Sequence, residues 1–97
     1  MKHNRLTLTA TLENKEPLRY SPAGVPVLNF RLVHQSEQIE AGRPRIVSCE
    51  LAGIAIGDTA MLLAKLEPGQ ELQFSGFLAT KRRYEIAELH VVEFIAT

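Results

Sequence analysis

The sequence predicts an all-β fold of five strands, with one short helix between the third and the fourth strand. Several segments alternate apolar and polar residues at period two, which is typical of half-buried strands. Only one segment, residues 60–66, has apolar residues at helical spacing, and turn residues separate the segments. At 97 residues the chain has room for a single core, so residues 1–97 are expected to form one domain.

The first predicted strand covers Arg5 to Glu13, where apolar residues alternate with threonines. One set is expected to face the core and the other set to face solvent. The inward set is Leu6, Leu8, Ala10 and Leu12, and the outward set is Thr7, Thr9 and Thr11. The segment Ser21-Pro22-Ala23-Gly24 then predicts a tight turn, in which Gly24 can adopt a positive φ.

The second predicted strand covers Val25 to Ser36, with Leu28, Phe30 and Leu32 on one face and Arg31 on the other. Polar residues 37–44, centred on Ala41-Gly42, predict a flexible loop into a third strand over residues 45–51. In that strand Val47, Cys49 and Leu51 share a face. Because Cys49 is the only cysteine, no disulfide can form within the chain, and a buried small apolar role is expected for it.

The helix is predicted over Ala60 to Leu66, with Asp58 or Thr59 as its N-cap and Pro68-Gly69 after its end. Leu62 and Leu66 are four residues apart and are expected to lie on the core.

The fourth predicted strand begins near Gly69, with Leu72, Phe74 and Leu78 on its apolar face. Gly76 falls on that same face, where a missing side chain allows sharp coiling or the close approach of another backbone. A hairpin tip of three consecutive cations follows, and the fifth strand is predicted from Tyr84 to Ile95. This order of elements matches the OB-fold, a five-stranded, partly open barrel.

An OB-fold binds oligonucleotides or oligosaccharides on the outer face of strands two and three and in two adjacent loops. The net charge is zero, with 11 basic and 11 acidic residues, so local clusters of cations have to provide any attraction for nucleic acid. The predicted groove would hold phosphates through cations and stack bases on tyrosines. The candidate residues are Tyr20, Arg31, Arg43, Arg45, Lys81, Arg82, Arg83 and Tyr84.

Each candidate also has a structural alternative. The cationic tip suits a solvated turn or the protection of a sheet edge. Tyr20 can pack in a turn beside Pro17 and Pro22, and Tyr84 can cover the rim of the barrel. Arg31 can pair with Glu50 across two strands, a surface contact worth roughly 0 to 1 kcal/mol.

Several short motifs occur together along nearly the whole chain. They are Asn4-Arg5-Leu6, Ser21-Pro22-Ala23-Gly24-Val25-Pro26, Phe30 and Leu32 followed by His34 and Ser36, Glu40-Ala41-Gly42, Gly76-Phe77 and Leu89-His90. Their order and spacing resemble the bacterial primosomal replication protein N (PriB) family. The resemblance implies an OB-fold similar to that of bacterial single-stranded DNA-binding protein, and a homodimer formed through the first strands. It also implies binding of single-stranded DNA and of the primosomal helicase during replication restart, and help in loading later primosome components.

The chain departs from a well-known branch of that family in three places. Arg43 and Ser48 stand where that branch has aromatic residues, the chain has no Trp, and the loop after Thr80 is several residues shorter. Binding is therefore expected to depend on phosphate contacts more than on stacking, and to show little sequence preference.

Neither a catalytic site nor a metal or cofactor site is predicted. His3, His34 and His90 are isolated, with no second ligand at short spacing, and no nucleophile turn is recognisable. The basic N-terminus leads into alternating residues, not an apolar signal segment, and no apolar run approaches the ~20 residues that cross a bilayer. A cytosolic protein without a membrane partner is expected.

Two other functions fit the same pattern. One is a protein-binding OB-fold adaptor whose basic tip docks on a partner and whose affinity for nucleic acid is weak or incidental. The other is an RNA-binding barrel of the translation apparatus, which would prefer RNA to DNA of equal length. Loss of oligonucleotide affinity on replacing Lys81, Arg82 and Arg83 would separate a DNA-binding protein from an adaptor.

Overall fold

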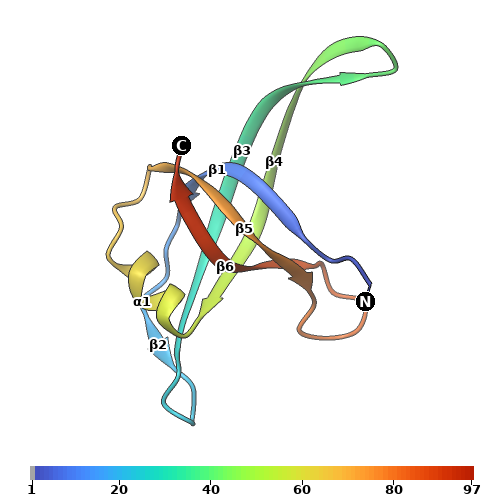
Figure 1. Cartoon of the computed structure of the whole chain (residues 1–97). Helices are drawn as coiled ribbons and strands as arrows, with labels where there is room; N and C mark the ends of the chain where they lie inside the picture. The colour runs from blue at the N-terminus through green and yellow to red at the C-terminus, as the bar shows by residue number, and fades with distance from the viewer. Residues whose placement is uncertain (1) are drawn as a thin grey trace.

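A computed structural model describes residues 2–97 of the chain (Figure 1). Within this range it has six strands and one helix. In chain order these are β1 (Leu6–Glu13), β2 (Arg19–Tyr20), β3 (Pro26–Glu40), β4 (Arg43–Ile56), α1 (Asp58–Ala64), β5 (Glu71–Ala79) and β6 (Glu88–Ala96). The five predicted strands and the helix are all present, and β2 is a short addition that the sequence did not predict.

Five of the strands form a closed ring. The hydrogen-bonded order is β1-β5-β6-β4-β3, and β3 returns to pair with residues 11–13 of β1. All pairs are antiparallel except β4 with β6, and β2 adds to β3 through Arg19 and Tyr20. Three strands, a helix and two strands that close in this way confirm the predicted OB-fold class.

The core fills the inside of this ring. Ala10 and Leu12 of β1 are buried, and Leu6 and Leu8 pack against the core, as the alternating pattern predicted. The other large buried side chains come from β3, β5, β6 and α1. They include Leu28, Phe30, Leu32, Leu63, Phe74 and Leu89.

The predicted flexible loop at residues 37–44 is wrong. β3 and β4 continue as paired strands to Glu40 opposite Arg43, so that only Ala41 and Gly42 form the turn. Both turn residues have positive φ, 53° and 76°, as in a two-residue type I′ hairpin. The hairpin projects from the ring as an arm (Figure 1), so its polar and apolar residues alike lie outside the core. We call residues 37–46, which are all exposed, the arm.

Cys49 is exposed, which contradicts the buried role predicted for it. The residues around it alternate in burial as predicted, with Val47 and Leu51 half-buried and Ser48 and Glu50 exposed. This part of β4 nevertheless lies beyond the core, and the strand becomes fully buried only from Gly53. The period of a strand identifies its two faces without showing where the core ends.

The phase and the cap of the helix also differ from the prediction. Ala60 and Leu63 face the core, whereas Leu62 is 54% exposed. Leu66, which follows the helix, does pack against the core. The N-cap is Gly57, with a φ of 82° and no side-chain cap hydrogen bond, so neither Asp58 nor Thr59 is the cap.

Gly76 allows a close approach of two strands, as predicted. A Cβ placed on Gly76 would lie 1.7 Å from the backbone oxygen of His90 in β6. The β5–β6 register shifts at the same point, between Ser75 and Gly76. Beyond it Leu78 is 39% exposed, because the end of β5 extends past the core.

The last strand begins at Glu88, four residues later than predicted. Tyr84 therefore lies in the loop of residues 80–87 between β5 and β6 and does not begin a strand. The helix α1 has seven residues, and no helix in residues 2–97 is long and apolar enough to cross a membrane.

Candidate nucleic-acid interface

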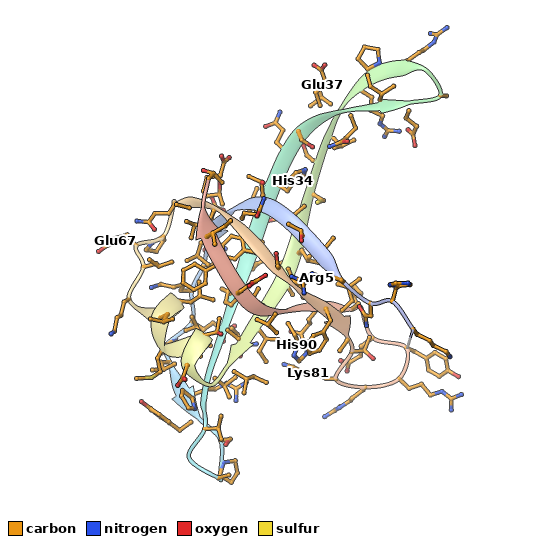
Figure 2. All side chains as sticks on the ribbon, in the orientation of Figure 1. Arg5, His34, Glu37, Glu67, Lys81 and His90 are labelled. Carbon is orange, nitrogen blue, oxygen red and sulfur yellow. The ribbon has the colours of Figure 1, made fainter. Side chains whose placement is uncertain are left out.

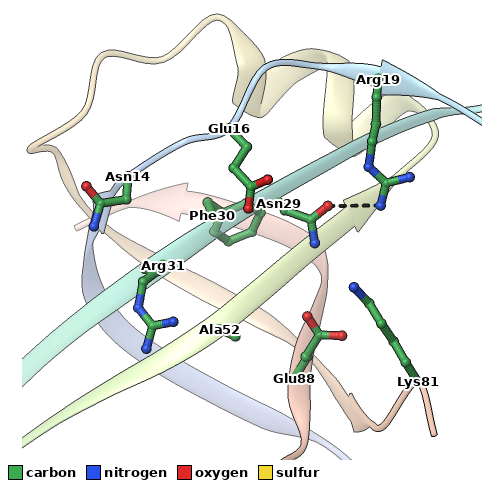
Figure 3. A pocket seen from close by; sticks show the side chains of 9 residues that line it. All are labelled: Asn14, Glu16, Arg19, Asn29, Phe30, Arg31, Ala52, Lys81 and Glu88. Atoms are coloured by element: carbon green, nitrogen blue, oxygen red, sulfur yellow. Dashed lines mark hydrogen bonds between the residues drawn. The ribbon is translucent and has the colours of Figure 1, made fainter.

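A groove lies on the outer side of β3 and β4, beside the β5–β6 loop. It consists of two adjoining hollows of about 460 and 550 Å³ that share Arg31, Ala52, Lys81 and Glu88. Figure 3 shows the first hollow. We call the two hollows together the loop groove. It occupies the part of an OB-fold that commonly binds oligonucleotides.

Three cations from three different segments line the loop groove. Arg31 projects from β3, opposite the small Ala52 of β4, and Lys81 reaches in from the β5–β6 loop (Figure 3). Arg19 comes from β2, and its Nη2 donates a hydrogen bond to Asn29 Oδ1 at 3.0 Å. Arg19 is not among the residues predicted from the sequence, because nothing local to it indicates that β2 lies beside β3.

Acidic side chains line the same groove. They are Glu16, Glu50, Glu85 and Glu88, four carboxylates against the three cations. The zero net charge of the chain therefore includes acids inside the groove, which reduce its attraction for phosphate. The β3–β4 register places Arg31 opposite Ala52 and Glu50 opposite Val33, and no ion pair links Arg31 to Glu50 in the described residues.

The predicted site residues do not all meet at the loop groove. Arg31, Lys81 and Tyr84 line it, and Tyr84 is 92% exposed. Arg82 and Arg83 are exposed on the same loop without lining either hollow, and the Arg83 guanidinium lies 5.2 Å from the centre of the Tyr84 ring.

The other candidates lie elsewhere. Arg43 and Arg45 are on the arm, where Arg45 forms an ion pair with Glu40. Figure 2 shows this arm, labelled by Glu37, far from Lys81. Tyr20 is 59% exposed on β2 and does not line the groove. The stacking role of Tyr20 and the phosphate-binding roles of Arg43 and Arg45 stay predictions.

His34 and His90 both contact other residues of the fold. His34 Nδ1 donates to the backbone oxygen of Thr9 at 2.5 Å, and its Nε2 lies 2.7 Å from Ser36 Oγ. His90 stacks on Phe77, with 4.9 Å between the ring centres. In residues 2–97 no three His, Cys, Asp or Glu side chains are grouped so that they could hold a metal ion.

Comparison with known proteins identifies the family. A family model described as another single-strand binding protein family matches residues 4–93. Replication restart protein PriB of Bordetella pertussis is 43% identical over 89 residues, which cover 91% of this chain and 83% of that protein. This chain belongs to the PriB family. PriB of Nitrosomonas europaea is 34% identical over 83 residues, or 86% of this chain and 77% of that protein.

Solved structures agree with this assignment. PriB from Ralstonia solanacearum superposes with a TM-score of 0.89 at 35% identity and covers 98% of both chains. A Plasmodium falciparum SSB complex with ssDNA gives a TM-score of 0.80 at 15% identity, covering 98% of this chain and 95% of that one, which shows a shared fold. The resemblance to PriB that the sequence motifs indicated is confirmed.

Proposed function

We propose that this protein is a single-stranded DNA-binding accessory protein of the replication-restart primosome, which binds DNA largely without sequence preference. The observation that supports this most directly is the loop groove itself. Arg31 and Lys81 converge with Tyr84 on the face where an OB-fold binds oligonucleotides. Membership of the PriB family and the relatives named replication restart protein PriB support the biological context.

In this proposal the groove binds the sugar–phosphate chain through charge. Arg19, Arg31 and Lys81 neutralise phosphates and release counterions, a term that does not depend on base identity. Tyr84 presents an almost fully exposed ring on which one base can stack. Arg82 and Arg83 extend the positive charge along the loop towards flanking nucleotides.

We further propose that the protein acts as a homodimer and bridges the primosomal helicase to later primosome components. Residues 6–10 of β1 pair with no strand other than β5 in the described part of the chain, although His34 donates to the Thr9 oxygen on the second edge. The rest of that edge is open to a strand from another copy. A separate hollow of about 290 Å³, which includes Ile56, Phe77 and Val92, offers an apolar surface to a protein partner.

The second candidate function is a protein-binding adaptor with weak or incidental affinity for nucleic acid. The four carboxylates inside the loop groove favour it, because they oppose the binding of phosphate. The apolar hollow at Phe77 would serve this function as well.

Fluorescence anisotropy of a labelled oligo-dT of ~30 nucleotides at several salt concentrations tests the proposal. Each phosphate contact to a single strand contributes about −0.7 to the slope of the logarithm of the binding constant against the logarithm of the salt concentration. If Arg19, Arg31 and Lys81 make the phosphate contacts, the slope is therefore about −2. If all six predicted cations do so, the slope is about −4. Lys81→Ala reduces the magnitude of the slope by about 0.7, whereas Arg43→Ala, on the arm, leaves it unchanged.

The absence of binding at low salt would contradict the DNA-binding function and favour the adaptor. Tighter binding to RNA than to DNA of equal length would instead favour the RNA-binding alternative.

A further inference from the structure

Glu88, at the start of β6, has an unsatisfied carboxylate in the loop groove. Its Oε1 is buried, with no hydrogen-bond partner among the described residues, and it is the only side-chain oxygen or nitrogen in residues 2–97 with this property. Burying such an oxygen without a partner costs free energy, so buried polar groups in proteins are nearly always paired. A movement of the neighbouring side chains that uncovers Oε1 would let a bound molecule donate a hydrogen bond to it, which would remove the cost.

The surroundings of Glu88 suit a nucleobase. Glu88 lines both hollows together with Arg31 and Lys81, which can bind an adjacent phosphate. The larger hollow, of about 550 Å³, also has Tyr84 and Ile86 on its loop side, 92% and 89% exposed. These two side chains can cover the apolar face of a base whose polar edge points towards Glu88.

We propose that Glu88 accepts a hydrogen bond from the exocyclic amine of a base, so that one subsite of the groove prefers cytosine to thymine or uracil. The inference rests on the proposed single-stranded DNA function and adds a base preference at one position. The N4 amine of cytosine donates, and acidic side chains accept from it in known base contacts. Thymine and uracil have a carbonyl oxygen at that position, which repels a carboxylate.

Lys81 is the competing partner inside the protein. It lines the same hollows, and a movement of the β5–β6 loop would let its ammonium pair with Glu88. In that case Glu88 would only weaken the attraction of the groove for phosphate, and the affinity for every oligonucleotide would fall by the same factor, whatever its bases. The two roles therefore differ in whether replacing Glu88 changes the ratio between bases.

The test compares oligo-dC with oligo-dU of about 15 nucleotides by anisotropy at neutral pH, because the two bases differ at position 4 and at the adjacent N3. We expect the wild-type protein to bind oligo-dC about fivefold tighter or more, near the lower limit for a specific base contact. Glu88→Gln abolishes the preference, because an amide can turn either its oxygen or its NH2 group towards the base. Glu85→Gln is the matched control: it removes the same charge from the groove and keeps the preference.

Equal binding of the two oligonucleotides by the wild-type protein would overturn the inference alone, whether or not the variants fold. A Glu88→Gln variant that shifts both affinities by one factor would overturn it too, and would identify Glu88 as a counter-ion. Failure to bind either oligonucleotide would overturn the proposed function together with the inference.

Discussion

Tyr84 lies in the β5–β6 loop with a φ of 69°, a backbone conformation that is uncommon for an aromatic residue. This conformation places the side chain at the loop groove and leaves it 92% exposed. Tyr20 is also exposed, but it lies on β2 outside the groove lining. The two tyrosines are therefore a matched pair for testing which of them stacks on a base.

Replacing Tyr84 by Ala is expected to weaken oligo-dT binding by about 1 to 3 kcal/mol, the usual loss for one base–aromatic stack. Tyr20→Ala is expected to leave the affinity unchanged. Anisotropy titrations of both variants at one low salt concentration measure the two effects. Equal losses would show that the bound strand extends to β2, and no loss for Tyr84→Ala would remove stacking from the proposed function.

Gly76 is a residue-scale requirement of the fold. Since its missing side chain lets β6 approach, Gly76→Ala forces the backbones of β5 and β6 apart. We expect a loss of about 1 to 3 kcal/mol in the free energy of unfolding, as for other overpacked sites. Urea denaturation measures it, with Glu71→Ala, an exposed change in the same strand, as the control expected within about 0.5 kcal/mol.

At the scale of elements, the arm of β3 and β4 is separate from the core. Its residues are exposed, including Ile39 and Ile46 at 69% and 60%, and its ion pair between Glu40 and Arg45 lies on the surface. Surface ion pairs of this kind add little to stability. The arm is thus available for contacts with another molecule at small cost to the fold.

Replacing residues 38–45 by Asn-Gly, a type I′ turn, joins Glu37 to Ile46 at a paired position. We expect the free energy of unfolding to change by less than about 1 kcal/mol, because no buried side chain is removed. Leu32→Ala, in the buried part of β3, is the control and is expected to cost about 2 to 5 kcal/mol. If the shortened protein also loses oligo-dT affinity, Arg43 and Arg45 contact DNA in spite of their distance from the groove.

At the scale of the whole molecule, β1 determines whether copies can associate. It contributes to ring closure through residues 11–13, while residues 6–10 have one edge that pairs with no strand in the described chain and is open except at the Thr9 oxygen, which accepts from His34. Thr7 and Thr9 are exposed on this strand. An antiparallel pair of β1 strands about a two-fold axis would join two rings.

Light scattering is expected to give a mass of about twice the 10.8 kDa of one chain. Thr9→Pro removes a backbone donor from the open edge of β1 and is expected to shift the mass towards that of one chain. Because Thr9 also pairs with Gln73 of β5, circular dichroism has to show that the variant is folded. A mass of one chain for the wild-type protein would contradict the dimer.

The sequence by itself determined five of the six strands in residues 2–97, though not the full length of β3 and β4, together with most of the core and one special backbone position. Alternation at period two is a local property of a strand, so it identified Leu12, Phe30 and Phe74 as inward, and Gly76 followed from a glycine on an apolar face. The OB-fold class then followed from the order of the elements. Cys49 and Leu62 show the limit of this reasoning, because periodicity does not tell how far the core extends.

Only the tertiary structure decided which charged residues meet. Arg31 and Lys81 are far apart in sequence, and closure of the ring brings them together over Ala52. The same strand register carries Arg43 away on the arm and places Glu88 inside the groove. The physical reason is that strand periodicity depends on neighbours along one chain segment, whereas the composition of a groove depends on the register between segments that are distant in sequence.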